Sequence, residues 1–463
     1  MILKRWNRIM SNKIQINDLT KEVVKIAWPV FIELLLGSLF GVINMMMVGQ
    51  IPDSAYATAA MASIGLTNQP LFLCLAFVQA LNVGGTAVIS RYYGAKKLHR
   101  IPSVLKHIML ISIVCFILPL SVLGWIFAHP VLLFLGAQPD AINIATDYFR
   151  LLMIAFIFQG FTMTISAALR GVGETKIPMR NNIIANLCNV FFNSILIYGL
   201  FGLPALHLMG TGIATILANM IAACLMFRYL ISGKGRIKFS LKEKFHFDYL
   251  TVQQLIKIGL PSAMEQLIFR SGAMIFTMIV AGLGTGVYAA HQIGLNIWTL
   301  SIAPSQAFGI SASVLVGKEL GAKAPEIAQR CAIIVRKLAF IVACIMGGIF
   351  FLFGKWIVLG YTSSDTIMAN MLLIMPLLAF VQPFLADNLA MTGALRGAGD
   401  TIWPMIATLI GVFIIRVALG HLFVSILHYG IVGAWWALAI NQIVTWLVVL
   451  LRYRTGKWKA IQI

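Results

Sequence analysis

The sequence predicts an all-α polytopic membrane protein with twelve transmembrane helices in two pseudo-symmetric six-helix lobes. Composition, the spacing of long apolar runs and an internal repeat together predict this class. Of the 463 residues, 60% are hydrophobic and 11% are charged, whereas about a quarter of the residues of a soluble protein are charged. This composition excludes a soluble globular domain, a disordered chain and a disulfide scaffold. The six cysteines lie inside apolar segments without metal-ligand spacing, and we interpret them as buried apolar side chains.

Apolar runs long enough to cross a hydrocarbon core of about 30 Å recur along the whole chain. The predicted spans are residues 24–48, 55–84, 104–128, 141–166, 180–200, 208–231, 252–283, 290–317, 331–354, 367–392, 402–427 and 429–451. The same spans divide the chain into an N-terminal arm (1–23), a first lobe (24–231), an amphipathic linker (232–250), a second lobe (251–451) and a tail (452–463).

Basic residues outnumber acidic residues and are unevenly distributed between the loops. The 35 Lys and Arg residues against 15 Asp and Glu residues give a formal net charge of +20. They concentrate in the arm, the linker, the tail and the segments after even-numbered spans, while the loops after the first, fifth, seventh and eleventh spans have none. By the positive-inside rule, both termini are expected in the cytoplasm of a multi-pass protein of the plasma or inner membrane. The excess of basic residues on one side therefore predicts anionic membrane lipids as partners, and this distribution argues against binding to nucleic acid.

The second half of the chain repeats motifs of the first half in the same order, at offsets of 226 to 232 residues. Each half holds six predicted spans, so the two repeats run parallel through the membrane. Two parallel repeats are a recurrent plan of secondary transporters, in which the lobes alternate access to the two sides. The matching segments are 25–33 with 257–265 (K-I-x-x-P-x-x-x-E), 94–96 with 321–323 (G-A-K), and 169–179 with 395–405 (L-R-G-x-G-x-T-x-x-P-M).

The repeated L-R-G-x-G-x-T motif resembles the signature of the multidrug and toxic compound extrusion (MATE) family. The segments 48–50 (VGQ), 289–293 (AAHQI) and 197–199 (IYG) resemble that family as well. The resemblance implies a monomer of two six-helix lobes around a central cleft, without an enzymatic activity or a resident cofactor. It further implies antiport, in which bulky cationic or amphipathic compounds leave the cell in exchange for protons or sodium ions. We expect the Arg and Thr of the motif to cap helix ends and its Gly to permit a tight turn.

Other classes of membrane protein remain as alternatives. A flippase for a lipid-linked or amphipathic metabolite, from a related two-lobed family, is the nearest one. A membrane-embedded enzyme would need clustered His, Asp or Ser at membrane depth, and the sequence has no HxxxD, HExxH or GxSxG motif. A channel would need a filter-like repeat, which we do not find.

Ionisable groups within the spans are functional candidates because they are costly to keep in a membrane. We expect Glu265 to carry the coupling cation, with a salt bridge to Arg270 as the structural alternative. Its repeat mate Glu33 is the next candidate, closer to the cytoplasmic end. Asp147 and Arg150 are three residues apart and predict a simple ion pair on one helix face.

Asp387 lies in the tenth span, where the resemblance implies a cation-coupling Asp, although its position is about two residues from the one expected. We predict that Asp387 takes part in coupling. The alternative is a structural ion pair with Arg270 or Arg416.

The first lobe differs from the resemblance because two positions expected to be acidic hold Asn44 and Asn193. Asn186, Asn189 and Asn193 share one helix face at spacings of three and four, and Thr211 is a weaker member of the same polar cluster. Amides cannot carry a proton, although their oxygens can ligate sodium. No metal site other than a sodium site is therefore expected, and coupling is predicted in the second lobe or at Glu33.

Overall fold

The computed structural model describes residues 2–136, 141–202, 204–240, 245–361 and 364–462. Within these ranges the chain is helical and has no strand, which confirms the all-α class. Eleven helical segments of the described residues have the length and apolar composition needed to cross a membrane. The Asn-rich helix α7 (Lys176–Tyr198) supplies the twelfth.

The chain forms two compact units. The N-lobe runs from Ile32 to Gly259, and the C-lobe runs from Leu260 onward and includes the start of the chain up to Phe31. Both boundaries fall inside long helices, α1 (Ile2–Gly49) and α9 (Tyr249–Ala281), close to the prolines Pro29 and Pro261 that these helices contain. Each of these two helices therefore contributes to both units.

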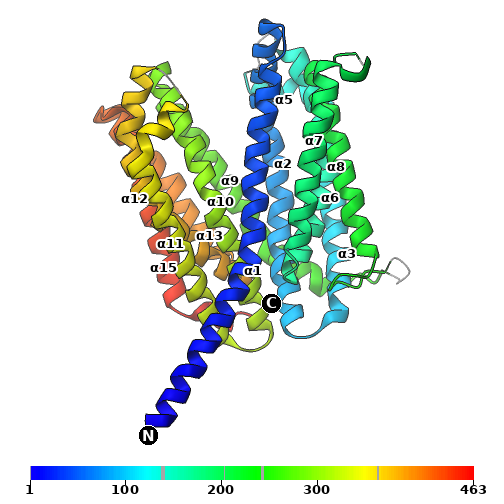
Figure 1. Cartoon of the computed structure of the whole chain (residues 1–463), viewed down its shortest axis with the longest axis vertical. Coiled ribbons are helices and arrows are strands. Elements are labelled where there is room, and N and C mark those ends of the chain that lie inside the picture. The colour runs from blue at the N-terminus through cyan, green and yellow to red at the C-terminus, as the bar shows by residue number, and fades with distance from the viewer. Residues whose placement is uncertain (1, 137–140, 203, 241–244, 362–363, 463) are drawn as a thin grey trace. The chain divides into compact units, whose positions relative to one another are not determined.

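The N-lobe core forms where α2 packs against α6 (Figure 1). Thr86 Oγ1 on α2 donates to the Ala167 carbonyl on α6 at 3.1 Å, and a Cβ on Gly171 would lie 2.9 Å from Ile89 Cγ2. Small residues thus let these two helices approach closely. Besides its parts of α1 and α9, the N-lobe contains α2 (Ser54–Gly94), η1 (Leu98–Arg100), α3 (Ile101–Ile111), η2 (Ser112–Ile117), α4 (Leu118–Ile126), α5 (Ala128–Phe134), α6 (Ile142–Gly171), α7, η3 (Leu200–Gly202) and α8 (His207–Ile231).

The C-lobe core forms where α12 packs against α10 and α11. Gly393 and Gly397 on α12 face the backbone of Gly309 and Ser313 on α10 so closely that an added Cβ would collide with it. This is a small-xxx-small contact. The C-lobe contains α10 (Thr285–Gly321), α11 (Pro325–Leu359), α12 (Asp365–Gly397), α13 (Ile402–Thr408), η4 (Leu409–Arg416), α14 (Val417–His421), η5 (Leu422–Ile426), α15 (Gly430–Arg454) and η6 (Lys457–Ala460).

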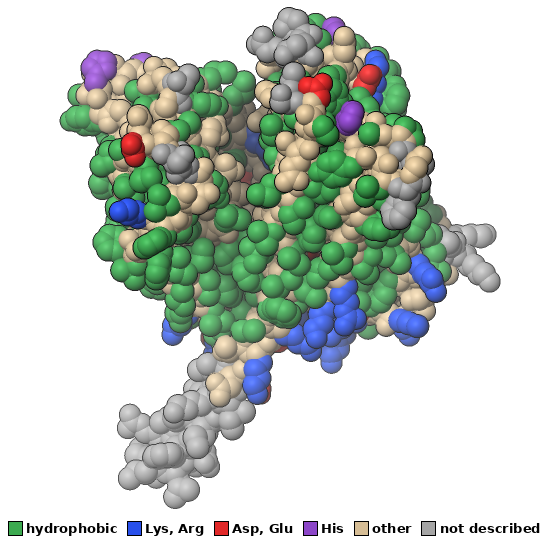
Figure 2. All heavy atoms as spheres, turned by 45° about the horizontal axis from the view of Figure 1, so that its top comes forward, with side chains coloured by type: hydrophobic (Ala, Val, Ile, Leu, Met, Phe, Trp, Pro, Cys, Tyr) green, Lys and Arg blue, Asp and Glu red, His purple; other side chains and the backbone are tan. Residues whose placement is uncertain are grey.

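Apolar side chains cover the sides of the helices, as Figure 2 shows, and Lys and Arg gather near the lower edge of that view. On α11, for example, Phe351, Leu352 and Trp356 are largely exposed. Apolar exposure of this extent suits contact with lipid tails rather than water.

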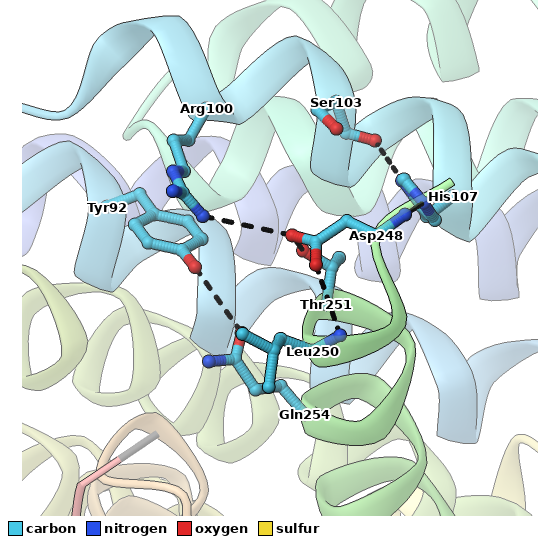
Figure 3. Close-up of polar contacts among 8 residues, drawn as sticks. All are labelled: Tyr92, Arg100, Ser103, His107, Asp248, Leu250, Thr251 and Gln254. Atoms are coloured by element: carbon cyan, nitrogen blue, oxygen red, sulfur yellow. Dashed lines mark hydrogen bonds and ion pairs between the residues drawn. The ribbon is translucent and has the colours of Figure 1, made fainter. Parts of the chain in front are cut away.

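The described part of the linker is fastened to the N-lobe at its end, just before α9 (Figure 3). The backbone N–H of Asp248 donates to His107 Nε2 at 2.8 Å, and Thr251 Oγ1 donates to the Asp248 carboxylate at 2.8 Å. Arg100 Nη1 lies 3.8 Å from the same carboxylate. The Thr251 hydroxyl is the main cause of a lowered pKa of Asp248. Residues 241–244 of the predicted linker lie outside the described residues.

Candidate functional site

The L-R-G motif supplies an arginine that binds a glutamate in each lobe. In the N-lobe, Arg170 in the last turn of α6 donates to Glu33 on α1 at 2.5 Å. In the C-lobe, Arg396 in the last turn of α12 donates to both carboxylate oxygens of Glu265 on α9 at 2.8 Å. Both carboxylates are buried. The two charged motifs that repeat along the chain therefore meet in the same way in each lobe.

Glu33 and Glu265 occupy the same depth in their helices. The separation in sequence from Glu33 to the end of α1 at Gly49 equals that from Glu265 to the end of α9 at Ala281. With a rise of about 1.5 Å per residue, both glutamates lie about 24 Å from that end. The two glutamates therefore hold equivalent positions along their helices, although the predicted spans began at different distances from them.

The predicted helix caps of the L-R-G motif were also wrong. The arginines bind glutamates on another helix, and Thr175 and Thr401 precede α7 and α13 without a side-chain capping bond. The glycine prediction is confirmed by the structure: Gly173 has φ of 79°, a left-handed conformation that suits glycine in a tight turn.

Asp387 on α12 is held by groups that the sequence did not suggest. Arg336 on α11 donates to both of its carboxylate oxygens, at 2.6 and 2.8 Å, and Trp446 Nε1 on α15 donates to one of them at 2.8 Å. The predicted partners Arg270 and Arg416 were wrong, because Asp387 pairs with Arg336 and Glu265 pairs with Arg396 instead.

Arg336, the partner that the sequence did not suggest, lies on α11, which begins earlier than predicted. Arg336 falls near the start of the predicted span 331–354, beside the basic residues that precede that span. In the structure, α11 begins at Pro325, well before Arg336, and α12 ends at Gly397, well after Asp387. At a rise of about 1.5 Å per residue, Arg336 lies about 16 Å from the start of α11 and Asp387 lies about 15 Å from the end of α12, so the two side chains lie at a similar level.

The N-lobe brings three of the predicted polar residues together. Asn44 Nδ2 donates to Asn189 Oδ1 at 2.8 Å, and Asn193 Nδ2 donates to Asn44 Oδ1 at 2.9 Å and to Asn189 Oδ1 at 3.1 Å. Thr215, which the sequence did not single out, accepts from Asn189 at 3.3 Å. The carbonyl of Thr211 accepts from Thr215, while the Thr211 hydroxyl is buried without a partner among the described residues. This site is neutral and rich in oxygen.

Asn186 does not join this cluster. Its amide donates to the carbonyl and the side chain of Asn182, one turn earlier on α7. The helical spacing predicted that Asn186 joins the cluster, but its amide is satisfied by Asn182 on the same helix. Asp147 and Arg150 form the predicted i,i+3 pair at 3.4 Å, and it is exposed.

The chain was compared with known proteins. The family model described as MatE matches residues 29–195 and 261–422. A probable multidrug resistance protein NorM of Thermotoga maritima is 28% identical over 453 residues, which cover 96% of this chain and 95% of that protein. The transporter YisQ of Bacillus subtilis is 27% identical over 444 residues, 95% of each chain.

Solved structures share the fold. An outward-facing multidrug resistance MATE family transporter matches with a TM-score of 0.86 at 20% identity, over 96% of each chain. A MOP superfamily transporter from Pyrococcus furiosus matches with a TM-score of 0.87 at 19% identity, over 96% of this chain and 97% of that one. The chain therefore belongs to the MATE family of membrane multidrug efflux transporters.

Proposed function

We propose that this protein is a secondary active antiporter that exports bulky cationic or amphipathic compounds in exchange for protons or sodium ions, by alternating access of its two lobes. The observation that carries the proposal is Asp387, a buried carboxylate well inside the membrane-spanning helix α12. A titratable carboxylate at this depth is costly unless it binds a cation, and such groups mark ion pathways in transporters.

The contacts of Asp387 indicate how a cation could change the C-lobe. Its charge is balanced by Arg336, which binds both carboxylate oxygens. A proton on the carboxylate would remove this charge and weaken the ion pair, and a sodium ion would compete with the guanidinium for the same oxygens. Either event would loosen α12 from α11.

Glu265 and Glu33 are the further coupling candidates, each bound to the arginine of an L-R-G motif. Release of either pair would free a contact between the first or seventh span and the cytoplasmic end of α6 or α12. The Asn44–Asn189–Asn193 cluster cannot titrate, so the proposed contribution of the N-lobe is limited to sodium ligation and substrate contacts.

The remaining features of the proposal concern surroundings and partners. We place the protein in the plasma or inner membrane with both termini in the cytoplasm, because the basic residues concentrate in segments of one side. We propose anionic lipids as contacts of these segments and a monomer as the transporting unit.

The test is transport in proteoliposomes under an imposed pH gradient or an imposed sodium gradient, with a cationic dye as substrate. Asp387→Asn and Glu265→Gln should each reduce gradient-driven export at least tenfold. Asp147→Asn, which alters an exposed pair, should export normally. Failure of both gradients to drive export would refute antiport, and gradient-independent movement of an amphipathic lipid would favour a flippase. Normal export by both C-lobe variants would refute the placement of coupling at these residues.

A further inference from the structure

Arg416 is a buried cation in the eleventh span without a carboxylate partner among the described residues. It ends the π-helix η4 (Leu409–Arg416), and the residue is 5% exposed. Its guanidinium carbon lies 4.3 Å from the centre of the Phe276 ring on α9. Short π-helical segments inside longer helices are frequent at functional sites. Arg416 is therefore unusual in two ways: it is a buried cation without a carboxylate partner among the described residues, and it lies in a π-helical segment.

The groups around Phe276 and its aromatic neighbours carry unused hydrogen-bonding nitrogens. His291 on α10 is fully buried, and its ring lies 5.8 Å from Phe276 and 5.8 Å from Trp435 on α15. Trp298 on α10 lies 5.9 Å from Trp435. Five nitrogens have no hydrogen-bond partner among the described residues: both ring nitrogens of His291, the indole nitrogens of Trp298 and Trp435, and Nε of Arg416. We call Arg416, Phe276, His291, Trp298 and Trp435 the Arg416 cluster.

Among the described residues, no carboxylate of the C-lobe balances this cluster. The carboxylates described in the interior of its membrane-spanning helices, away from the helix ends, are Glu265 and Asp387, and they bind Arg396 and Arg336. An isolated guanidinium is expensive in a bilayer. Stacking on Phe276 offsets part of this cost, because a desolvated cation–π contact contributes about 2 kcal/mol. The unused donors and the remaining cost both favour an anionic ligand.

We infer that the Arg416 cluster binds an anionic group, a carboxylate, sulfonate or phosphate, of the transported amphipathic compound. The guanidinium fork matches the two oxygens of such a group, and the rings of Phe276, Trp298 and Trp435 suit an adjoining apolar body. The inference rests on the proposed export of amphipathic compounds and predicts that, among them, compounds with a negative group are preferred, with or without a positive one.

Equilibrium binding to the purified full chain tests the inference with two dyes that differ by one group. Rhodamine 19 carries a free carboxylate, and rhodamine 6G is its ethyl ester with the same ring system. Binding is measured by fluorescence polarisation in detergent, in a Tris chloride buffer of low ionic strength, so that no carboxylate, sulfonate or phosphate of the buffer competes with the dye. Wild type should bind the acid about tenfold more tightly than the ester, which corresponds to about 1.4 kcal/mol.

The variants separate the charge of Arg416 from the stability of the fold. Arg416→Gln should lose the preference for the acid and keep its affinity for the ester within about twofold. Arg416→Lys should keep part of the preference, and Trp435→Phe, which removes one donor and keeps an aromatic ring, should reduce it severalfold. Lys355→Gln, at an exposed cation of the same lobe, should behave as wild type.

Equal affinity of wild type for the two dyes, or an unchanged preference in Arg416→Gln, would overturn the inference. If Arg416→Gln does not fold, an unchanged preference in both Arg416→Lys and Trp435→Phe would overturn it equally. The assay uses no ion gradient, so failure of antiport in proteoliposomes and failure of anion binding give separate results.

Discussion

Breaking the Glu265–Arg396 ion pair tests whether the L-R-G arginine fastens α12 to α9. Both donor contacts are 2.8 Å long, and the side chains are 11% and 22% exposed. Glu265→Gln and Arg396→Gln each remove one charge and leave the other buried. The double variant removes both charges and keeps similar volumes.

The expected magnitude follows from distance and burial. At 2.8 Å and an effective dielectric constant of about 20, the Coulomb attraction is about 6 kcal/mol before the cost of desolvation. Loss of one partner from a buried pair costs about 3–5 kcal/mol, because the remaining charge has no counter-ion. The double variant should be less destabilised than the sum of the single variants, with a coupling energy of about 2 kcal/mol.

The assay is unfolding by SDS in mixed detergent micelles, followed by circular dichroism, as a double-mutant cycle. Glu33 and Arg170 form the matched pair of the N-lobe and should give a similar coupling energy. The exposed Asp147–Arg150 pair at 3.4 Å is the control and should give at most about 1 kcal/mol. A coupling below about 0.5 kcal/mol for the Glu265 pair, the lower limit for residues in contact, would refute the reasoning.

Three further predictions concern packing, the amide cluster and the linker. Gly393→Ala should destabilise the C-lobe by about 1–3 kcal/mol or more in SDS unfolding, because its Cβ collides with the backbone of α10. Gly348→Ala, where no atom lies within 4 Å of the added Cβ, should be neutral. Asn44→Ala should lower stability by about 1–3 kcal/mol in the same assay, because two buried amides lose their partner. The pKa of Asp248 lies below its ordinary value of 3.8, so its contribution to linker docking is present above that pH and is lost as the pH falls through the lower folded value. Limited proteolysis of the linker from neutral to strongly acidic pH should detect its release as the pH falls, and Thr251→Val should move the part of the release that depends on Asp248 to higher pH.

The sequence predicted the architecture because lipid imposes one simple constraint on every span. An apolar run of sufficient length must be helical to satisfy its backbone in lipid, so twelve runs predicted twelve helices. α7 shows the limit of hydropathy, since its amides keep it out of the eleven described segments that qualify by apolar composition. The apolar run over residues 180–200 nevertheless predicted this helix.

Side-chain partners were harder to predict, because they depend on which helices pack together. The Glu33–Arg170 and Glu265–Arg396 pairs could have been found, since each joins two repeated motifs of opposite charge. The Arg336–Asp387 pair could not, because neither residue belongs to a repeated motif that would indicate its partner on another helix. The spacing of residues within one helix does not indicate a contact between side chains of two different helices.

The two lobes share their Glu–Arg ion pairs but differ in the other charges of their membrane-spanning helices. Glu33 and Glu265 are repeat mates, and each binds an L-R-G arginine, so both lobes share this contact. At the offset of the L-R-G repeat, Asp387 corresponds to Phe161 and Arg416 corresponds to Val190. The same fold therefore forms in the N-lobe with apolar residues at both positions. The membrane makes these two charges costly, which supports the proposed roles of Asp387 in cation coupling and of Arg416 in binding an anionic group.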